Sequence, residues 1–263
     1  MSKFTLISGP CAVEDKDTCF QIAEKLKMLA EKYNLDLIFK GSYKKANRTK
    51  LNSFTTIGTM KALEILEDVK NEFNVNIITD VHESHEPKVI SNVADYLQIP
   101  AFLCRQTELL INSGKYAKRG VNIKKGQFLA PEMMEFAAQK VKSGNPNNEI
   151  LLTERGTTFG YEYLVTDMTS FPKMNPFGTT IMDCTHSVQV PNQSNGITGG
   201  DSRMIGIMAK AAIASGANGL FIETHPVPSK ASSDAGSILQ LDLLESILED
   251  CVRIYDALNY ERD

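Results

Sequence analysis

The stretch DTCFQIAEKLKMLAEKYNLDLIFK, residues 17–40, contains the unit that decides the fold. Its first part, Asp17 to Tyr33, repeats apolar side chains at helical spacing behind an aspartate suited to capping a helix N-terminus. Its second part, Leu35 to Lys40, is a short apolar run typical of a strand covered on both faces. A helix followed at once by a buried strand is the repeating unit of a parallel α/β fold.

The same alternation of short apolar runs and amphipathic segments occurs along the whole chain. The last amphipathic segment begins at Ile238 and would complete an outer layer of helices. Eight strands followed by helices favour a (β/α)₈ barrel, and we expect residues 1–263 to form one catalytic domain of this kind. The expected strands are Phe4 to Ser8, Leu35 to Lys40, Asn76 to Thr79, Tyr96 to Ile99, Gly120 to Lys124, Glu149 to Thr153, Thr179 to Asp183 and Gly219 to Glu223.

Composition excludes several classes of protein. The chain has 28 Lys and Arg against 32 Asp and Glu, so it lacks the basic excess of a nucleic-acid-binding protein. The apolar run near the start is too short for a secretion signal or a membrane span, and we expect a cytosolic protein. The 5 cysteines are odd in number and lack CxxC spacing, so they indicate neither a disulfide framework nor a zinc knuckle.

Two long irregular stretches interrupt the alternation, at Gly41 to Gly58 and at Gln189 to Ser202. Both follow a predicted strand. In a barrel such loops lie at the C-terminal end of the strands, where active sites are built, so their length is a further functional signal.

Polar residues follow each predicted strand directly. If the eight strands close, these groups converge on one mouth. They are Cys11; Lys40 with Ser42 and Lys45; Asp80 with His82; Arg105 with Gln106; Lys124 with Lys125; Glu154 with Arg155; His186; and Glu223 with His225.

Five of these residues are cations: Lys40, Lys45, Arg105, Lys124 and Arg155. Several like charges around one cavity repel strongly unless an anion neutralises them. Arginine matches a phosphate or carboxylate in two contacts and lysine adds a point charge, so the set predicts a phosphorylated carboxylic acid as ligand. The alternative for each residue alone is a solvated surface cation.

A metal site is the second hypothesis. Cys11, His186, Glu223 and Asp234 all lie at expected strand ends or in the adjoining loops, and all carry metal-ligand atoms. A thiolate, an imidazole and carboxylates suit Zn²⁺, Fe²⁺, Co²⁺ or Mn²⁺. The alternative is an inert, buried Cys11.

Asp80 and His82 share one face of a strand, because alternate residues point the same way. Together they could hydrogen-bond a substrate hydroxyl or carbonyl. The alternative is a capping aspartate beside a structural histidine.

A motif then identifies a resemblance. The segment KANRT, residues 45–49, resembles the 3-deoxy-D-manno-octulosonate 8-phosphate synthases. The resemblance extends over nearly the whole chain. It includes SGPCA at 8–12, TDVHE at 79–83, LQIPAFLCRQT at 97–107, VNIKKGQF at 121–128, ERG at 154–156, DCTHS at 183–187, GGDSR at 199–203 and FIETHP at 221–226.

This resemblance implies condensation of phosphoenolpyruvate with D-arabinose 5-phosphate, a step of lipopolysaccharide biosynthesis. The alternative is the related 3-deoxy-D-arabino-heptulosonate 7-phosphate synthase of the shikimate pathway, whose family carries Lys-Pro-Arg-Thr where this chain has Lys45-Ala-Asn-Arg48. A silent phosphosugar-binding barrel is the alternative from another class. Metal-dependent members of the family carry Cys at the position of Cys11 and metal-independent members carry Asn, so the chain is similar to the metal-dependent branch, with one divalent ion.

The resemblance also implies roles for individual residues. Phosphoenolpyruvate would be held at its carboxylate region by Lys40, Ser42 and Lys45, and at its phosphate by Arg105, Lys124 and Arg155, with Gln106 also binding substrate. The aldose phosphate would be bound by Arg48 and Thr49, which reach a neighbouring subunit in a homotetramer. The residues expected to be catalytic are Lys45, Asn47, Asp80, His186 and Asp234.

Overall fold

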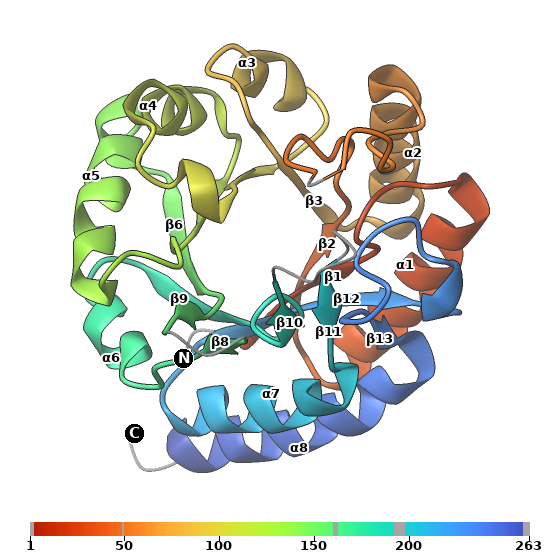
Figure 1. Ribbon diagram of the computed structural model, residues 1–263, viewed down its shortest axis with the longest axis vertical. Helices are drawn as coiled ribbons and strands as arrows, with labels where there is room; N and C mark the ends of the chain where they lie inside the picture. Colours follow the sequence, from red (N-terminus) through yellow and green to blue (C-terminus); the bar gives the residue numbers. More distant parts are fainter. Residues whose placement is uncertain (1–2, 49, 160–162, 192–197, 260–263) are drawn as a thin grey trace.

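The computed structural model describes residues 3–48, 50–159, 163–191 and 198–259. Its main sheet is a closed barrel of parallel strands, in which β12 pairs both with β9 and with β1 (Figure 1). The (β/α)₈ barrel predicted from the sequence is therefore confirmed. The barrel strands are β1 (Thr5–Gly9), β2 (Asp36–Lys40), β3 (Asn76–Asp80), β4 (Tyr96–Ile99), β5 (Gly120–Lys124), β6 (Glu149–Glu154), β9 (Thr179–Asp183) and β12 (Gly219–His225).

The helices form a layer outside the barrel (Figure 1). The cap of the first helix is Asp15, whose side chain accepts a hydrogen bond from the backbone N–H of Thr18 at 2.7 Å. The helices are α1 (Lys16–Lys32), α2 (Thr59–Phe73), α3 (Glu86–Ile90), α4 (Thr107–Tyr116), α5 (Met134–Gly144), α6 (Ser170–Met174), α7 (Ile205–Ala214) and α8 (Leu244–Asn259).

The helix expected from Ile238 onward begins later than its apolar pattern indicates. Residues Leu239–Gln240 form the short strand β13, which extends the barrel edge beside β12, and a 3₁₀ turn over Leu241–Leu243 precedes α8. Ile238, Leu239 and Leu241 are buried although they are not in an α-helix. The apolar residues at the start of this segment are therefore spaced as in a helix because they are buried, although they do not form one.

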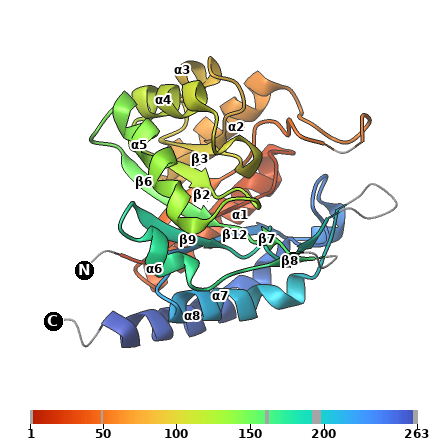
Figure 2. The same ribbon diagram turned by 60° about the vertical axis from the view of Figure 1, so that its left-hand side comes forward.

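Two short antiparallel strand pairs lie at the C-terminal end of the barrel. The expected loop after β9 contains β10 (Gln189–Val190) paired with β11 (Gly199–Gly200), and β7 (Thr157–Thr158) pairs with β8 (Leu164–Val165) after β6. Figure 2 shows the segments that follow β2 and β12 projecting from the same end of the barrel, away from both chain ends. The long segments thus surround the mouth where the site was predicted.

The barrel interior is built in layers. Its apolar layer contains Ile7, Ile38, Ile78, Tyr96, Leu151, Ile181 and Phe221, all buried. Because side chains alternate along a strand, the residue two positions further on also points inward, one layer closer to the C-terminal end. Those residues include Lys40, Asp80, Gln98, Asp183 and Glu223. A polar layer therefore rests directly on an apolar one.

The contact between α4 and α5 provides a test of the packing. A Cβ added to Gly114 would lie 2.0 Å from the carbonyl oxygen of Val141, whereas one added to Gly206 in α7 would meet only ordinary contacts at 3.5 Å or more. We expect Gly114→Ala to lower the free energy of unfolding by about 2 kcal/mol, through overpacking.

Urea unfolding of Gly114→Ala and of the control Gly206→Ala measures this difference. The control is expected to be neutral or more stable by up to about 1 kcal/mol, since alanine favours a helix. Equal stability of the two variants would contradict the packing described here.

Candidate active site

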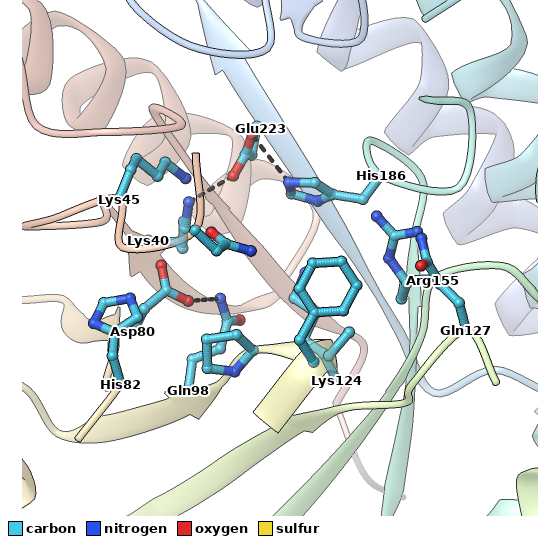
Figure 3. Close-up of a pocket in the computed structure, with 14 residues that line it drawn as sticks. Lys40, Lys45, Asp80, His82, Gln98, Lys124, Gln127, Arg155, His186 and Glu223 are labelled. Atoms are coloured by element: carbon cyan, nitrogen blue, oxygen red, sulfur yellow. Dashed lines mark hydrogen bonds and ion pairs between the residues drawn. The ribbon is translucent and has the colours of Figure 1, made fainter. Parts of the chain in front are cut away.

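A pocket opens at the C-terminal ends of the barrel strands. Its free volume is about 630 Å³ including the open mouth, which suits small-molecule ligands. Figure 3 shows its side chains converging from strands far apart in the sequence. The lining residues are Lys40, Lys45, Asn47, Asp80, His82, Gln98, Pro100, Ala101, Phe102, Lys124, Gln127, Arg155, His186 and Glu223.

Lys40 and Glu223 form a buried ion pair at the floor of the pocket. Lys40 Nζ donates to Glu223 Oε1 at 2.5 Å and to the backbone carbonyl of Cys11 at 2.7 Å. Burial alone would raise the pKa of Glu223, but Lys40 and His186 hold it below its usual value. The Glu223 carboxylate is therefore ionised, and its charge balances that of Lys40.

Lys124 has its own carboxylate partner, Asp183. Lys124 Nζ pairs with Asp183 Oδ2 and lies 3.2 Å from the centre of the Phe221 ring, which adds a cation–π contact. Burial would raise the pKa of Asp183, yet His186 and Lys124 hold it far below its usual range. Asp183 also binds His186 Nδ1 at 2.8 Å, which leaves the Nε2 atom facing Glu223.

Lys45 and Arg155 are the pocket cations without a carboxylate at ion-pair distance among the described residues. Lys45 Nζ donates to Ser42 Oγ at 3.1 Å. Arg155 donates through Nη2 to Gln189 at 2.9 Å, while its buried Nη1 has no hydrogen-bond partner within the described ranges. Figure 3 shows Lys45 and Arg155 on opposite sides of the pocket. Two positions for anionic groups follow from this arrangement.

The charge expected for the pocket is thus partly balanced within the protein. The prediction from the sequence counted five cations that only a ligand would neutralise. Lys40 and Lys124 are instead neutralised by Glu223 and Asp183, because the strand alternation places these carboxylates in the same layer.

Asp80 is held by donors from two sides. Ser42 Oγ donates to its Oδ2 atom, and Gln98 Nε2 donates to its Oδ1 atom at 2.5 Å. Burial would raise the pKa of Asp80, but Lys40 and Lys45 lower it well below its usual value. Asp80 is therefore a fixed, ionised acceptor that faces the pocket.

His82 lies beside Asp80 in the pocket lining, as predicted from their spacing. Glu86 Oε2 accepts the backbone N–H of His82 at 2.6 Å and lies 3.4 Å from its Nδ1 atom. Burial would raise the pKa of Glu86, yet contacts with His82 lower it to about 2. The Glu86 carboxylate therefore holds both the backbone and the ring of His82 in position.

Three of the four predicted metal ligands form one cluster. One ligand atom from each of Cys11, Glu223 and Asp234 lies within 4.8 Å of the others. His186 is outside this cluster, but its Nε2 atom is 3.8 Å from Glu223 Oε2. The cluster adjoins the pocket, because Glu223 belongs to the cluster and also lines the pocket.

The donor set fits a divalent metal ion. Glu223 Oε2 is buried and has no hydrogen-bond partner in the part of the chain that the structure describes, while its other oxygen accepts from Lys40. Cys11 Sγ donates to Asp234 Oδ2 at 3.2 Å, and burial raises the pKa of the thiol. Asp234 adopts a left-handed backbone with φ of 53°, and despite its burial Lys45 and His186 lower its pKa to about 2. A cation here would satisfy the free oxygen and favour the thiolate.

Some predicted binding residues lie outside the pocket. Arg105 and Gln106 are exposed and do not contribute to its lining, although Ala101 and Phe102 of the preceding 3₁₀ turn do. Arg48 donates to Ser233 Oγ at 2.6 Å, next to Asp234. Thr49 lies outside the described residues.

Lys124 rather than Lys125 faces the pocket. Lys125 is buried in the wall, where it donates to the backbone carbonyls of Gly126 and Leu129 and lies 3.4 Å from a Glu154 carboxylate oxygen. Adjacent residues at the end of a strand point to opposite faces, which explains the difference.

Sequence reasoning missed four polar residues of the site: Gln98, Gln127, Asp183 and Gln189. The signal for Gln98 and Asp183 is present in the alternation, since each lies two positions beyond a residue of the apolar layer. Gln189 joins two parts of the site, because it accepts from Arg155 and donates to Asp234 Oδ1 at 3.2 Å. Its position in the short strand β10, outside the barrel, carries no comparable signal in the sequence.

The sequence of the chain matches those of known proteins over nearly its whole length. The sequence pattern of the DAHP synthetase I family matches residues 2–257. The chain belongs to the DAHP synthetase I family. This assignment covers every strand of the barrel and every lining residue of the pocket.

Relatives named 2-dehydro-3-deoxyphosphooctonate aldolase align along nearly the whole chain. One from Protochlamydia amoebophila is 46% identical over 254 residues, which is 96% of this chain and 92% of the relative. One from Bartonella bacilliformis is 47% identical over 249 residues, covering 93% and 86%. One from Campylobacter jejuni is 43% identical over 268 residues, covering 98% of each. These matches confirm the resemblance drawn from the motifs.

The helices that the structure describes include none with the length and apolar character needed to cross a membrane.

Proposed function

We propose that the protein condenses phosphoenolpyruvate with D-arabinose 5-phosphate and water, giving 3-deoxy-D-manno-octulosonate 8-phosphate and inorganic phosphate. The observation that carries the proposal is the pair of cations, Lys45 and Arg155, that face one pocket without carboxylate partners. The relatives named 2-dehydro-3-deoxyphosphooctonate aldolase support the choice of substrates. The KANRT segment supports the five-carbon aldose, because the related heptulosonate synthases carry Lys-Pro-Arg-Thr there, and Lys45 and Asn47 of this segment line the pocket.

In this proposal the two ends of phosphoenolpyruvate bind at the two sides of the pocket. Its phosphate lies against Arg155 and Lys124, where the buried Nη1 atom of Arg155 needs an acceptor. Its carboxylate lies near Lys45 and Lys40, with Ser42 next to them. Arginine can bind a phosphate through two parallel hydrogen bonds, and lysine adds a positive charge next to a phosphate or carboxylate.

The aldose would bind beside the Asp80 cluster. Asn47 and Asp80 line the pocket and could hold hydroxyl groups near the reacting aldehyde. Arg48 and Thr49 would hold the aldose phosphate.

The chemistry would proceed by addition to the aldehyde. C3 of phosphoenolpyruvate forms a bond to C1 of the aldose, water adds at C2, and the tetrahedral centre expels inorganic phosphate by cleavage of its C–O bond. Holding two polyanions at fixed positions contributes much of the rate, because it replaces a collision of like charges by an oriented encounter.

Cys11, His186, Glu223 and Asp234 would hold one divalent ion such as Zn²⁺, Fe²⁺, Mn²⁺ or Co²⁺. When bound, the ion supplies polarisation of an oxygen ligand or a lower pKa for bound water. Asp183 would orient His186, since its contact with Nδ1 leaves Nε2 free to act as a ligand.

We also propose that the protein is a cytosolic homotetramer whose chain is one catalytic domain. The five cysteines are free and buried, which suits a reducing compartment. Sharing of the aldose phosphate site through Arg48 and Thr49 would require an oligomer.

A turnover assay with two sugars tests the substrate proposal. With phosphoenolpyruvate present, we expect phosphate release with arabinose 5-phosphate at least about tenfold faster than with erythrose 4-phosphate, equal to about 1.4 kcal/mol of discrimination. Mass spectrometry of the product provides the control. Release with erythrose 4-phosphate alone would instead favour the 3-deoxy-D-arabino-heptulosonate 7-phosphate synthase, and binding without turnover would favour a silent barrel.

Metal content tests the metal site independently of turnover. Cys11→Ser is expected to lower the affinity for Zn²⁺ or Mn²⁺ by at least about tenfold, because it removes a thiolate ligand. Cys184→Ser is the matched control, since Cys184 is buried in the wall and should leave the metal content unchanged.

Both variants are measured by elemental analysis after dialysis against the metal. Exhaustive chelation of the unmodified protein should abolish turnover, and refilling should restore it. Equal metal content in the two variants, or full activity of metal-free protein, would exclude the proposed site.

A further inference from the structure

A chain of hydrogen bonds crosses the barrel interior behind Asp80. The backbone register pairs Asp80 with Gln98 and Gln98 with Asn122, so these residues lie side by side on β3, β4 and β5. Gln98 Nε2 donates to Asp80 Oδ1 at 2.5 Å, and Asn122 Nδ2 donates to Gln98 Oε1 at 2.9 Å. Thr153 Oγ1 on β6 completes the chain by donating to Asn122 Oδ1 at 2.6 Å.

The last two members of this chain do not reach the pocket. Asp80 and Gln98 line it, whereas Asn122 and Thr153 are fully buried, each 0% exposed, and lie outside the lining. Their side-chain hydrogen bonds reach the pocket through Gln98 and Asp80.

The direction of every hydrogen bond in the chain follows from the charge at its end. Asp80 is ionised and can only accept, so Gln98 must present its NH₂ group to it and its carbonyl oxygen to Asn122. Asn122 must then present its own NH₂ group, which leaves its oxygen facing Thr153. A donor is required at that position, and the Thr153 hydroxyl is that donor.

We propose that Asn122 and Thr153 are positioning residues that fix the orientation of the Gln98 amide and, through it, the carboxylate of Asp80 toward the aldose. This inference rests on the proposed function for the identity of the aldose. Among the described residues, Gln98 donates a hydrogen bond to Asp80 Oδ1 and Ser42 donates one to Oδ2. Reversal of the amide would place a carbonyl oxygen against the carboxylate and release Oδ1.

The Thr153 hydroxyl can be removed with little change of shape. Thr153→Val replaces the hydroxyl by a methyl group, Thr153→Ala removes both the hydroxyl and the methyl group, and Thr153→Ser retains the hydroxyl while losing the methyl group. A role of the hydroxyl predicts that valine and alanine behave alike and that serine behaves like the unmodified protein. A role of packing predicts that serine and alanine are impaired together.

The experiment is steady-state kinetics on the full chain with phosphoenolpyruvate and arabinose 5-phosphate each varied in turn. For Thr153→Val and Thr153→Ala we expect the KM for arabinose 5-phosphate to rise about tenfold, as expected for misplacement of a contact group. The KM for phosphoenolpyruvate should change less than about twofold, because the side chains of Lys45, Lys124 and Arg155 bind other partners and take no part in this chain of hydrogen bonds. Thr153→Ser should restore both values.

Other outcomes would overturn the inference. They are unchanged KM values in the valine and alanine variants, an equal rise in both KM values, and failure of serine to restore the KM for the aldose. Circular dichroism and thermal unfolding establish that each variant is folded, and Thr153→Ala replaces Thr153→Val if the added methyl group prevents folding. Failure of the unmodified protein to use arabinose 5-phosphate would instead reject the proposed function, so the two failures are distinguishable.

Discussion

The buried pairing of lysines with carboxylates is the interaction on which the site depends. Removing an unpaired ammonium group from water costs several kcal/mol, so Lys40 and Lys124 can lie inside the barrel only with partners. Glu223 and Asp183 are these partners, and strand alternation places Lys40, Asp183 and Glu223 in the layer above the apolar interior. The charged layer is thus both a consequence of the barrel and the floor of its pocket.

This pairing decides which groups remain available to a ligand. With Lys40 and Lys124 balanced, Lys45 and Arg155 are the cations that still favour an anion. Gln189 connects Arg155 with Asp234, and Asp234 in turn accepts from Cys11. The Arg155 side of the pocket and the cluster of Cys11, Glu223 and Asp234 are therefore parts of one hydrogen-bonded structure, in which a ligand at one part would stabilise the geometry of the other.

The sequence was sufficient to predict the barrel because its strands are buried on both faces. Each expected strand agrees with the structure within two residues. Local sequence patterns gave wrong predictions where tertiary contacts determine the structure. Ile238 and Leu239 are buried without being helical, and Arg105 follows a strand yet is exposed to solvent. The ion pair between Lys124 and Asp183 could not be predicted either, because the two residues lie 59 positions apart in the chain. The identity of the aldose required resemblance, since pocket charge alone does not distinguish phosphosugars.

A crystal structure with phosphoenolpyruvate bound is the measurement that tests the central claim most directly. The unpaired cations predict the phosphate within hydrogen-bond distance of Arg155 Nη1 and Lys124 Nζ, and the carboxylate at Lys45 and Ser42, with the Lys40–Glu223 pair intact. A phosphate bound at Lys45 with the carboxylate at Arg155, or a ligand that binds outside this pocket, would contradict the account.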